Sequence, residues 1–360
     1  MKAPRNTWYA AGWPSDFTAA PTQRTILEEP LVFFRTSVGK LVALHNICTH
    51  RFAPLHMGKV IGDTLECPYH GLRYNTSGVC VFNPDLDGQV SPRSRVNSYP
   101  VVEKGGVCWI WMGDPAEADE AKIVDFPFLH SPDTYRPLKG YLHVRANYHL
   151  LIDNLVDVAH GLILHAGTLS TPGLAKGHHE VGRDGDGIWV KRSADECVPS
   201  PVFDMLWRRV RGDYTGLLDH WTEARWDAPT LISQVTGSQV HGEPHETGLQ
   251  TRNCHLVTPA TEHSSHYFWA ICRNFLLDDD RLDDEMRVGI DYAFIEQDEK
   301  MLEAVHRNLN GRDFWDMKPA LLKGDSGTVL IRRAIDRLVA AENQSSAEPA
   351  KRIDTSQVPS

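Results

Sequence analysis

The feature that most restricts what this chain can fold into is a pair of short motifs, each holding one cysteine and one histidine. The first is Cys48-Thr-His50, and after sixteen further residues the second follows as Cys67-Pro-Tyr-His70. The chain has seven cysteines, whose spacing does not resemble a disulfide framework. In a reducing compartment, cysteine and histidine clustered in this way indicate metal ligands rather than disulfide bridges.

The order of these four residues distinguishes between two kinds of metal centre. A Rieske [2Fe–2S] cluster takes Cys-x-His from one loop and Cys-x-x-His from a second. Structural zinc uses the same residue types, but the common zinc finger has both cysteines first and both histidines last. The order here favours the Rieske cluster. The five other cysteines have no partner at ligand spacing, and we expect them to be ordinary buried residues: Cys80, Cys108, Cys197, Cys254 and Cys272.

With 360 residues the chain exceeds the usual size of one domain, so we expect two domains with separate cores. Up to residue 113 it consists of short β-branched and aromatic segments, such as 24–34, punctuated by Gly, Pro, Asn and Asp, which is typical of an all-β domain. We place this domain and a proline-rich connector at 1–135, a second domain at 136–342, and a polar, disordered tail at 343–360.

The second domain combines strand patterns with helix patterns, so its expected class is α+β with an antiparallel sheet. Its predicted strands include 141–146, 250–258 and 265–274, and its predicted helices are 149–165 and about 283–309.

Charge and hydropathy exclude some kinds of partner. Lys and Arg total 37 and Asp and Glu 47, so the formal charge is −10, and no basic block stands out. This argues against nucleic acid or an anionic membrane as the main partner. The start of the chain, 1–13, lacks the apolar region of a secretory signal, and no apolar run could span a bilayer. We therefore expect a cytoplasmic protein.

The predicted helix 149–165 is apolar around most of its circumference, which is typical of a buried helix. A polar stripe at helical spacing interrupts it, and buried ionisable groups must be paired or metal-bound. His160 and His165 are five residues apart, so an ideal helix would separate them by roughly 140°. If both bind one ion, the helix must bulge or end between them, which Gly161 would ease. The stripe consists of Asp153, Asn154, Asp157 and His160.

A carboxylate should complete this second centre, because non-haem Fe(II) oxygenases use two histidines and one carboxylate. The acids between 278 and 300 are numerous, but helical phase separates them. Asp298 shares a face with apolar residues and should point inward, whereas we expect Glu296, Glu299 and Glu303 to be solvated, with Glu296 pairing with Lys300.

Together these motifs resemble the oxygenase components of Rieske non-haem iron oxygenases, over nearly the whole chain from Asn6 to about Leu338. Within that family the chain is most similar to the aromatic O-demethylases of the vanillate and dicamba type. The cluster loops hold Ala53 and Tyr69 where respiratory Rieske proteins carry an extra cysteine pair, which favours the oxygenase branch. The segments that carry the resemblance are 8–10, 51–55, 153–157, 255–259, 266–269, 273–275 and 296–298.

The resemblance implies a role for each candidate residue. It assigns the [2Fe–2S] cluster to Cys48, His50, Cys67 and His70, and the mononuclear iron to His160, His165 and Asp298. Asp157 would connect a cluster histidine of a neighbouring subunit to an iron-binding histidine, in a head-to-tail homotrimer. Asn154 would lie beside the iron, and His255 would contact the substrate.

The function implied is oxidation of a small aromatic compound by O₂, with electrons from a reductase or ferredoxin. The expected reaction is O-demethylation of a methoxybenzoate-like compound to a phenol and formaldehyde. An N-dealkylase, a methyl hydroxylase or a ring dioxygenase would use the same scaffold, so these remain open. Outside oxygenase chemistry, the alternatives are an electron-transfer protein and a zinc-stabilised binding module.

Overall fold

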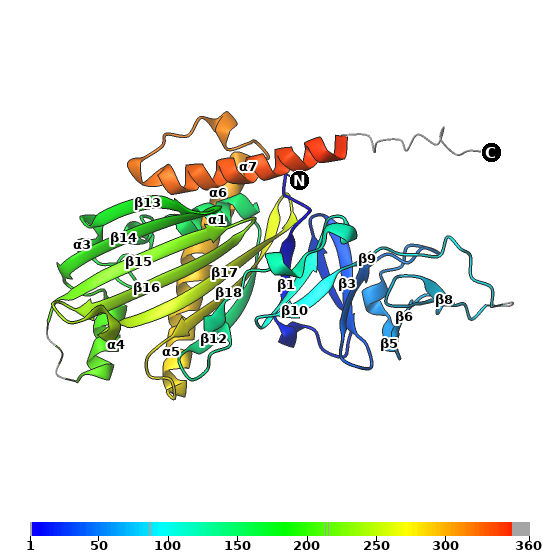
Figure 1. Cartoon of the computed structure of the whole chain (residues 1–360), viewed down its shortest axis with the longest axis horizontal. Helices are drawn as coiled ribbons and strands as arrows, with labels where there is room; N and C mark the ends of the chain where they lie inside the picture. The colour runs from blue at the N-terminus through cyan, green and yellow to red at the C-terminus, as the bar shows by residue number, and fades with distance from the viewer. Residues whose placement is uncertain (1, 86–87, 213, 215, 348–360) are drawn as a thin grey trace, which may run out of the picture.

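The computed structural model describes residues 2–85, 88–212, 214 and 216–347, and its first part is built from short strands (Figure 1). Three small antiparallel sheets form, with strand orders β1-β11-β10, β2-β3-β4-β9 and β5-β6-β7-β8. The expected all-β first domain is therefore present. The strands are β1 Trp8–Gly12, β2 Thr22–Ile26, β3 Glu29–Arg35, β4 Leu41–His45, β5 Lys59–Ile61, β6 Thr64–Glu66, β7 Arg73–Tyr74, β8 Cys80–Phe82, β9 Ser98–Tyr99, β10 Val101–Lys104 and β11 Val107–Trp111.

The segment 24–34 contributes a hairpin rather than one strand, because its centre turns back on itself. Leu27 and Glu28 have φ values of 51° and 67°, as a tight two-residue turn requires. Their amide groups donate 2.9 Å hydrogen bonds to the carbonyls of Pro259 and Ala260. The turn therefore joins the first part of the chain to the large sheet of the second.

A seven-stranded antiparallel sheet forms the second part, in the order β12-β18-β17-β16-β15-β14-β13. This confirms the expected α+β class with an antiparallel sheet. Consecutive residues are buried along 254–260 and 265–270, and successive side chains of a strand point to opposite faces, so both faces of this part of the sheet are covered. Its strands are β12 Arg136–Val144, β13 His178–Asp184, β14 Gly187–Cys197, β15 Leu218–Asp227, β16 Leu231–Val240, β17 Leu249–Thr261 and β18 Ser264–Arg273.

The two faces of the large sheet pack against different partners. On one face, Trp226 and Trp269 share a core with the helices α1 and α7. On the other face, Leu256 and Phe268 pack against Trp109 of the first domain and against apolar residues of the connector. The helices are α1 Tyr148–Val156, α2 Gly161–Leu164, α3 Pro172–Ala175, α4 Pro201–Val210, α5 Asp280–Asp291, α6 Lys300–Leu309 and α7 Ser326–Ala347, with a π-helix Tyr292–Glu299 joining α5 to α6.

Three predicted boundaries were wrong. The helix predicted at 149–165 ends at Val156 and resumes only at Gly161, because Asp157 leaves the helical conformation (ψ 91°). The helix predicted at 283–309 begins at Asp280 and contains the π-helical segment. The tail predicted from 343 is helical as far as Ala347, and 348–360 lie outside the described residues. Among the residues described, no helix has both the length and the apolar character needed to cross a bilayer.

Candidate metal centres

The loops that carry the two Cys/His motifs have the same backbone geometry. In each, the cysteine carbonyl accepts a hydrogen bond from the amide four residues later, Phe52 or Gly71, at 3.0 and 3.1 Å. Each cysteine amide donates to the carbonyl five residues later, Ala53 or Leu72, at 2.9 and 2.8 Å. Phe52 and Gly71 both have positive φ, 59° and 71°. Two equivalent turns therefore face each other and present their cysteines and histidines symmetrically.

The four predicted cluster residues come together with the thiols inside and the imidazoles outside. Cys48 and Cys67 are buried, whereas His50 and His70 are exposed, with ring centroids 4.5 Å apart. Burial raises the pKa of the Cys67 thiol. The Tyr74 hydroxyl lies 3.2 Å from Cys48 Sγ. Two inner sulfurs and two outer nitrogens are the donor set of a Rieske cluster, so the residues fit that group.

The break after α1 positions the two other histidines. Asp157 ends the helix, and its carbonyl oxygen accepts a hydrogen bond of 2.5 Å from His160 Nδ1. His165 lies at the C-terminal end of the short helix α2. As a result His160 Nε2 and His165 Nε2 point at the same place, 3.3 Å apart. The helix was expected to bulge or end between His160 and His165, but this was wrong: the break precedes His160, and the residues between the two histidines are helical.

Asp298 completes the group from the π-helix. Its Oδ1 atom lies 3.6 Å from His160 Nε2 and 3.4 Å from His165 Nε2, and the residue is buried. Within the described ranges, His160, His165 and Asp298 are the one set of three metal-ligand side chains whose donor atoms lie within 4.8 Å of one another. Two imidazoles and a carboxylate facing one point fit an Fe(II) ion and would leave coordination positions open.

Two further hydrogen bonds orient the histidines and fix their tautomers. His160 Nδ1 is held by the Asp157 carbonyl, and His165 Nδ1 donates to Gln297 Oε1 at 2.8 Å. Both Nε2 lone pairs are therefore free for a metal. Gln297 also donates from Nε2 to the Leu164 carbonyl at 2.6 Å, which anchors it to α2. Sequence reasoning missed Gln297; its position next to Asp298 was the available signal.

Asn154, on the last turn of α1, lies beside the three metal-ligand side chains, where the sequence analysis expected it. Its Nδ2 atom donates to Asp298 Oδ1 at 3.2 Å and lies 3.5 Å from His160 Nε2. Asp157 is half-buried, with Oδ2 4.0 Å from His160 Nδ1. The remaining stripe residue, Asp153, forms a two-pronged ion pair with Arg332 of α7, at 2.9 to 3.0 Å from Arg332 Nε.

The prediction for the three neighbouring glutamates was partly wrong. Glu296 is exposed and pairs with Lys300, as expected. Glu303, however, is only 9% exposed, because Arg145 lies over it and forms two hydrogen bonds of 2.9 and 3.1 Å. Glu299 is half-buried and lines a small cavity beside Asp298.

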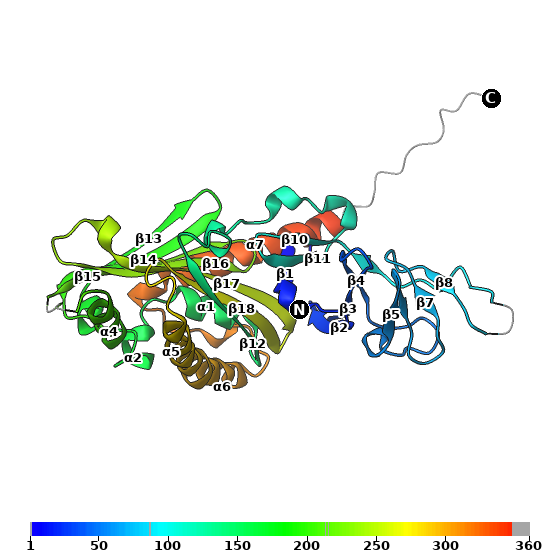
Figure 2. The same cartoon turned by 90° about the horizontal axis from the view of Figure 1, so that it is seen from below.

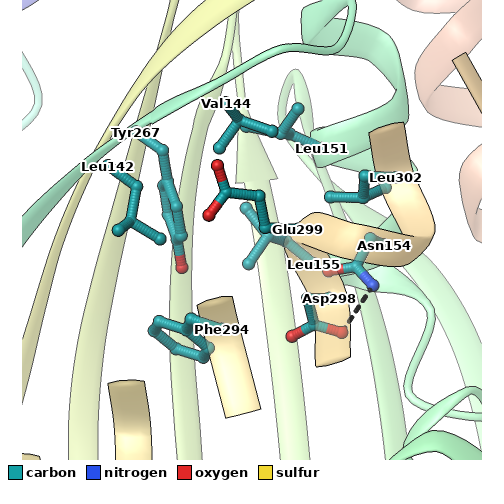
Figure 3. Close-up of a pocket in the computed structure, with 10 residues that line it drawn as sticks. All are labelled: Leu142, Val144, Leu151, Asn154, Leu155, Tyr267, Phe294, Asp298, Glu299 and Leu302. Atoms are coloured by element: carbon teal, nitrogen blue, oxygen red, sulfur yellow. Dashed lines mark hydrogen bonds between the residues drawn. The ribbon is translucent and has the colours of Figure 1, made fainter. Parts of the chain in front are cut away.

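That cavity lies between α1, the π-helix and the edge of the large sheet (Figure 3). Its wall is mainly carbon, with Asn154 and Asp298 together at one place and the carboxylate of Glu299 among the apolar side chains. It is lined by Leu142, Val144, Leu151, Asn154, Leu155, Tyr267, Phe294, Asp298, Glu299 and Leu302.

His255, the predicted substrate contact, lies behind this wall and is not one of the ten lining residues. It is 2% exposed, its Nδ1 lies 2.7 Å from the Tyr267 hydroxyl, and its Nε2 lies 3.4 Å from Gln234 Oε1. Burial lowers the pKa of His255 to about 4, so the ring is neutral at physiological pH. All seven cysteines are buried and unbridged, which agrees with the expectation for the five outside the cluster loops.

Comparison with known proteins matches both parts of the chain to described families. Residues 7–100 match the Rieske [2Fe–2S] domain, and residues 144–341 match the vanillate O-demethylase oxygenase C-terminal domain.

Curated relatives align along almost their full length. The oxygenase component of chloroacetanilide N-alkylformylase from Rhizorhabdus wittichii is 38% identical, covering 94% of this chain and 97% of the relative. The oxygenase component of dicamba O-demethylase from Stenotrophomonas maltophilia is 37% identical, covering 94% and 98%. The crystal structure of dicamba monooxygenase bound to dicamba superposes with a TM-score of 0.87 at 35% identity, covering 94% of this chain and 98% of that one.

Proposed function

We propose a specific reaction for this chain. The chain belongs to the family of Rieske non-haem iron oxygenase components. It is therefore an oxidoreductase that uses a Rieske [2Fe–2S] cluster and a mononuclear iron. The reaction is the oxidative O-demethylation of a methoxybenzoate-like compound. The observation that carries the proposal is the match of 144–341 to the vanillate O-demethylase C-terminal domain, which includes all three of His160, His165 and Asp298.

The atoms balance as follows. One oxygen atom of O₂ enters a C–H bond of the aryl methyl ether, and the other leaves as water with two protons and two electrons from a reductase or ferredoxin. The resulting hemiacetal breaks its C–O bond to give a phenol and formaldehyde. The iron, when bound, supplies the activation of O₂. The protein positions the reactants and excludes water.

We assign the iron to His160, His165 and Asp298 and the cluster to Cys48, His50, Cys67 and His70. If the chain were an electron-transfer protein without oxygenase activity, the group of His160, His165 and Asp298 would have no function. That group is buried, its imidazoles are oriented by Asp157 and Gln297, and its three donor atoms face one point. Such an arrangement supports an iron-binding role.

Electron transfer to the iron should come from a neighbouring subunit. Figures 1 and 2 both place β5–β8, which carry the cluster loops, at the end of the molecule remote from α1 and α2. Large apolar side chains are exposed beside both centres: Phe52 and Tyr69 next to the cluster histidines, and Ile163 and Leu169 in and after α2. A head-to-tail homotrimer would bring these surfaces together, with Asp157 between a cluster histidine and His160.

Subunit complementation tests this arrangement. Two inactive variants, His70→Ala and Asp298→Ala, would be co-expressed with different tags and the doubly tagged oligomers purified. The proposal expects partial recovery of turnover, because one subunit supplies a cluster to the iron of its neighbour. Doubly tagged oligomers that remain inactive, while singly tagged wild-type controls turn over, would contradict it.

The test of the reaction itself measures O₂ uptake and formaldehyde release together. Iron-loaded protein would be given NADH, a surrogate reductase and a panel of methoxybenzoates and other aryl methyl ethers. The proposal expects one formaldehyde per O₂ for at least one compound. We also assign His255 to substrate contact, so His255→Ala should raise the KM for that compound and leave the iron content unchanged.

N-Dealkylation is the second candidate function. It is favoured by the 38% identity to the oxygenase component of chloroacetanilide N-alkylformylase, against 37% for the dicamba O-demethylase relative. Both reactions oxidise a carbon attached to a heteroatom, so the same iron site would serve. Adding N-alkyl anilides to the panel separates the two, since only one class should give tight coupling between O₂ uptake and dealkylated product.

A further inference from the structure

The cavity beside Asp298 is too small for an aromatic substrate. Its volume is about 20 Å³. Cavities that accept benzene in other proteins have volumes of roughly 150 Å³, whereas a single small molecule such as water needs only about 10–15 Å³. The space therefore suits a guest of two or three atoms.

The wall of the cavity is suited to an apolar guest. Figure 3 shows the side chains of Leu142, Leu155 and Phe294 around the space, with the Tyr267 ring standing alongside. Val144, Leu151 and Leu302 complete the apolar part of the lining. A polar guest would lose hydrogen bonds against such a wall, whereas an apolar gas would lose none.

One end of the cavity reaches the metal ligands. Asn154 and Asp298 both line it, and they are hydrogen-bonded to each other (Figure 3). Asn154 Nδ2 also lies 3.5 Å from His160 Nε2, so Asn154 lies between the cavity and His160, and Asp298 lies between the cavity and His165. A small molecule in the cavity would therefore be one side chain from the iron.

The other end lies toward the surface. Glu299, which also lines the cavity, is half-buried, and the neighbouring Arg145 is exposed. Leu142 lies on β12, which is the edge strand of the large sheet. The cavity thus connects the outer edge of the sheet with the iron ligands, and Tyr267 and Phe294 separate it from the buried His255.

We propose that this cavity is a binding site and entry path for dioxygen, which reaches the iron past Asn154, separately from the aromatic substrate. The inference rests on the proposed function, because it concerns the route of one of the two reactants of that reaction. Size, apolar lining and position beside the ligand group all suit O₂, and size excludes the second reactant.

The first test does not depend on turnover. Crystals of the holoenzyme would be pressurised with krypton, an apolar atom that reports gas-binding cavities. Krypton density between Leu142, Leu155 and Phe294 is expected. Crystals soaked with an aryl methyl ether should show the aromatic ring elsewhere; a ring in this cavity, or krypton bound only at other places, would overturn the proposal.

The second test fills the cavity by Leu142→Phe. Krypton binding should be lost, and kcat/KM for O₂ should fall by about tenfold, which corresponds to roughly 1.4 kcal/mol of added barrier. The KM for the organic substrate and the iron content should not change. Leu322→Phe, at a position 74% exposed, is the matched control. An unchanged kcat/KM for O₂ in a Leu142→Phe enzyme whose crystal structure shows the cavity filled would refute the path.

A third variant covers the case in which the larger side chain prevents folding. Leu142→Ala enlarges the space, so krypton occupancy should rise and kcat/KM for O₂ should not fall; lower occupancy would contradict the proposal. Failure of the proposed reaction remains distinguishable, because krypton binding and O₂ dependence can be measured with whichever compound the enzyme oxidises.

Discussion

The two metal centres differ in how the chain builds them and in how far they are from solvent. The residues that we assign to the cluster span 48 to 70 and come from two turns with the same backbone hydrogen bonds, whose histidines are exposed. The iron ligands span residues 160 to 298, come from a helix break and a π-helix, and include two buried residues, His165 and Asp298. An electron can cross an exposed imidazole edge, whereas O₂ chemistry requires water to be kept out. The exposure of each centre therefore suits its role: the exposed histidines suit electron transfer, and the buried group suits O₂ chemistry.

The largest expected effect is the loss of one centre without the other. Asp298→Ala should remove the mononuclear iron and abolish turnover, while the visible absorbance of the cluster persists, because the two ligand sets share no residue. His70→Ala should do the reverse. Iron content per chain and the visible spectrum check both, and Glu296→Ala, an exposed residue on the same helix, is the control. Loss of both centres in either variant would show that they are not independent.

A large effect on stability is expected from Arg332→Met. Arg332 is buried and pairs with Asp153 on α1, the helix that carries Asn154. Removing one partner of a buried ion pair costs roughly 3–5 kcal/mol, because the other charge is left without compensation. Urea unfolding would measure the change, with exposed Arg333→Met as the control. Equal stabilities of the two variants would mean that the Arg332–Asp153 ion pair does not stabilise the fold.

Removing the hydrogen-bond partner of an iron ligand should have an intermediate effect. Gln297→Leu deletes the acceptor for His165 Nδ1, and loss of such partners typically lowers metal affinity or activity by about 10–100-fold. Competition with a chelator would measure iron affinity. The cluster spectrum should be unchanged, since the exposed centre has no contact with Gln297. Wild-type iron affinity in this variant would rule out the orienting role.

The smallest expected effect is on the pH dependence of folding stability, to which a buried histidine contributes and an exposed histidine does not. His266 lies between the domains, with Nε2 2.9 Å from the Thr25 carbonyl, and burial lowers its pKa to about 3. An unfolded histidine binds a proton near pH 6.5, so the unfolded state gains protons first as the pH falls, and folding stability decreases. Between pH 7.5 and 5.5 this amounts to about 1 kcal/mol for one such residue.

His266→Gln should reduce that pH dependence, whereas His178→Gln, at an exposed position, should leave it unchanged. Urea unfolding at the two pH values provides the measurement. An identical pH dependence in all three proteins would show that His266 is not the residue responsible.

The cluster loops could be predicted from the sequence because all their information is local. Residue order within Cys48–His50 and Cys67–His70 is enough to distinguish a Rieske cluster from zinc. Asp298 could also be predicted, because apolar neighbours on its helix face identify the buried side. Both inferences use residues that are close together in the chain.

The errors arose where distant residues decide the outcome. Glu303 is buried because Arg145, on the other side of the site, covers it, and no pattern within its helix reveals this. The role of Gln297 depends on its contacts with Leu164 and His165, which lie close to it only because the chain changes direction after α1. The break itself was expected, but its position at Asp157 depends on the hydrogen bond to His160. Helical periodicity also assumed an α-helix at 292–299, where the turns are wider.

Because of these wider turns, the positions of the side chains in this helix depend on its exact number of residues. In a π-helix each hydrogen bond spans five residues rather than four, so the segment Tyr292–Glu299 contains more chain than an α-helix between the same two points. Deleting one residue there would allow a regular α-helix between the same two points, but would change the direction in which the remaining side chains of the segment point. Gln297 and Asp298 could then no longer both meet His165. Insertions and deletions at this segment should therefore be far less tolerated than substitutions.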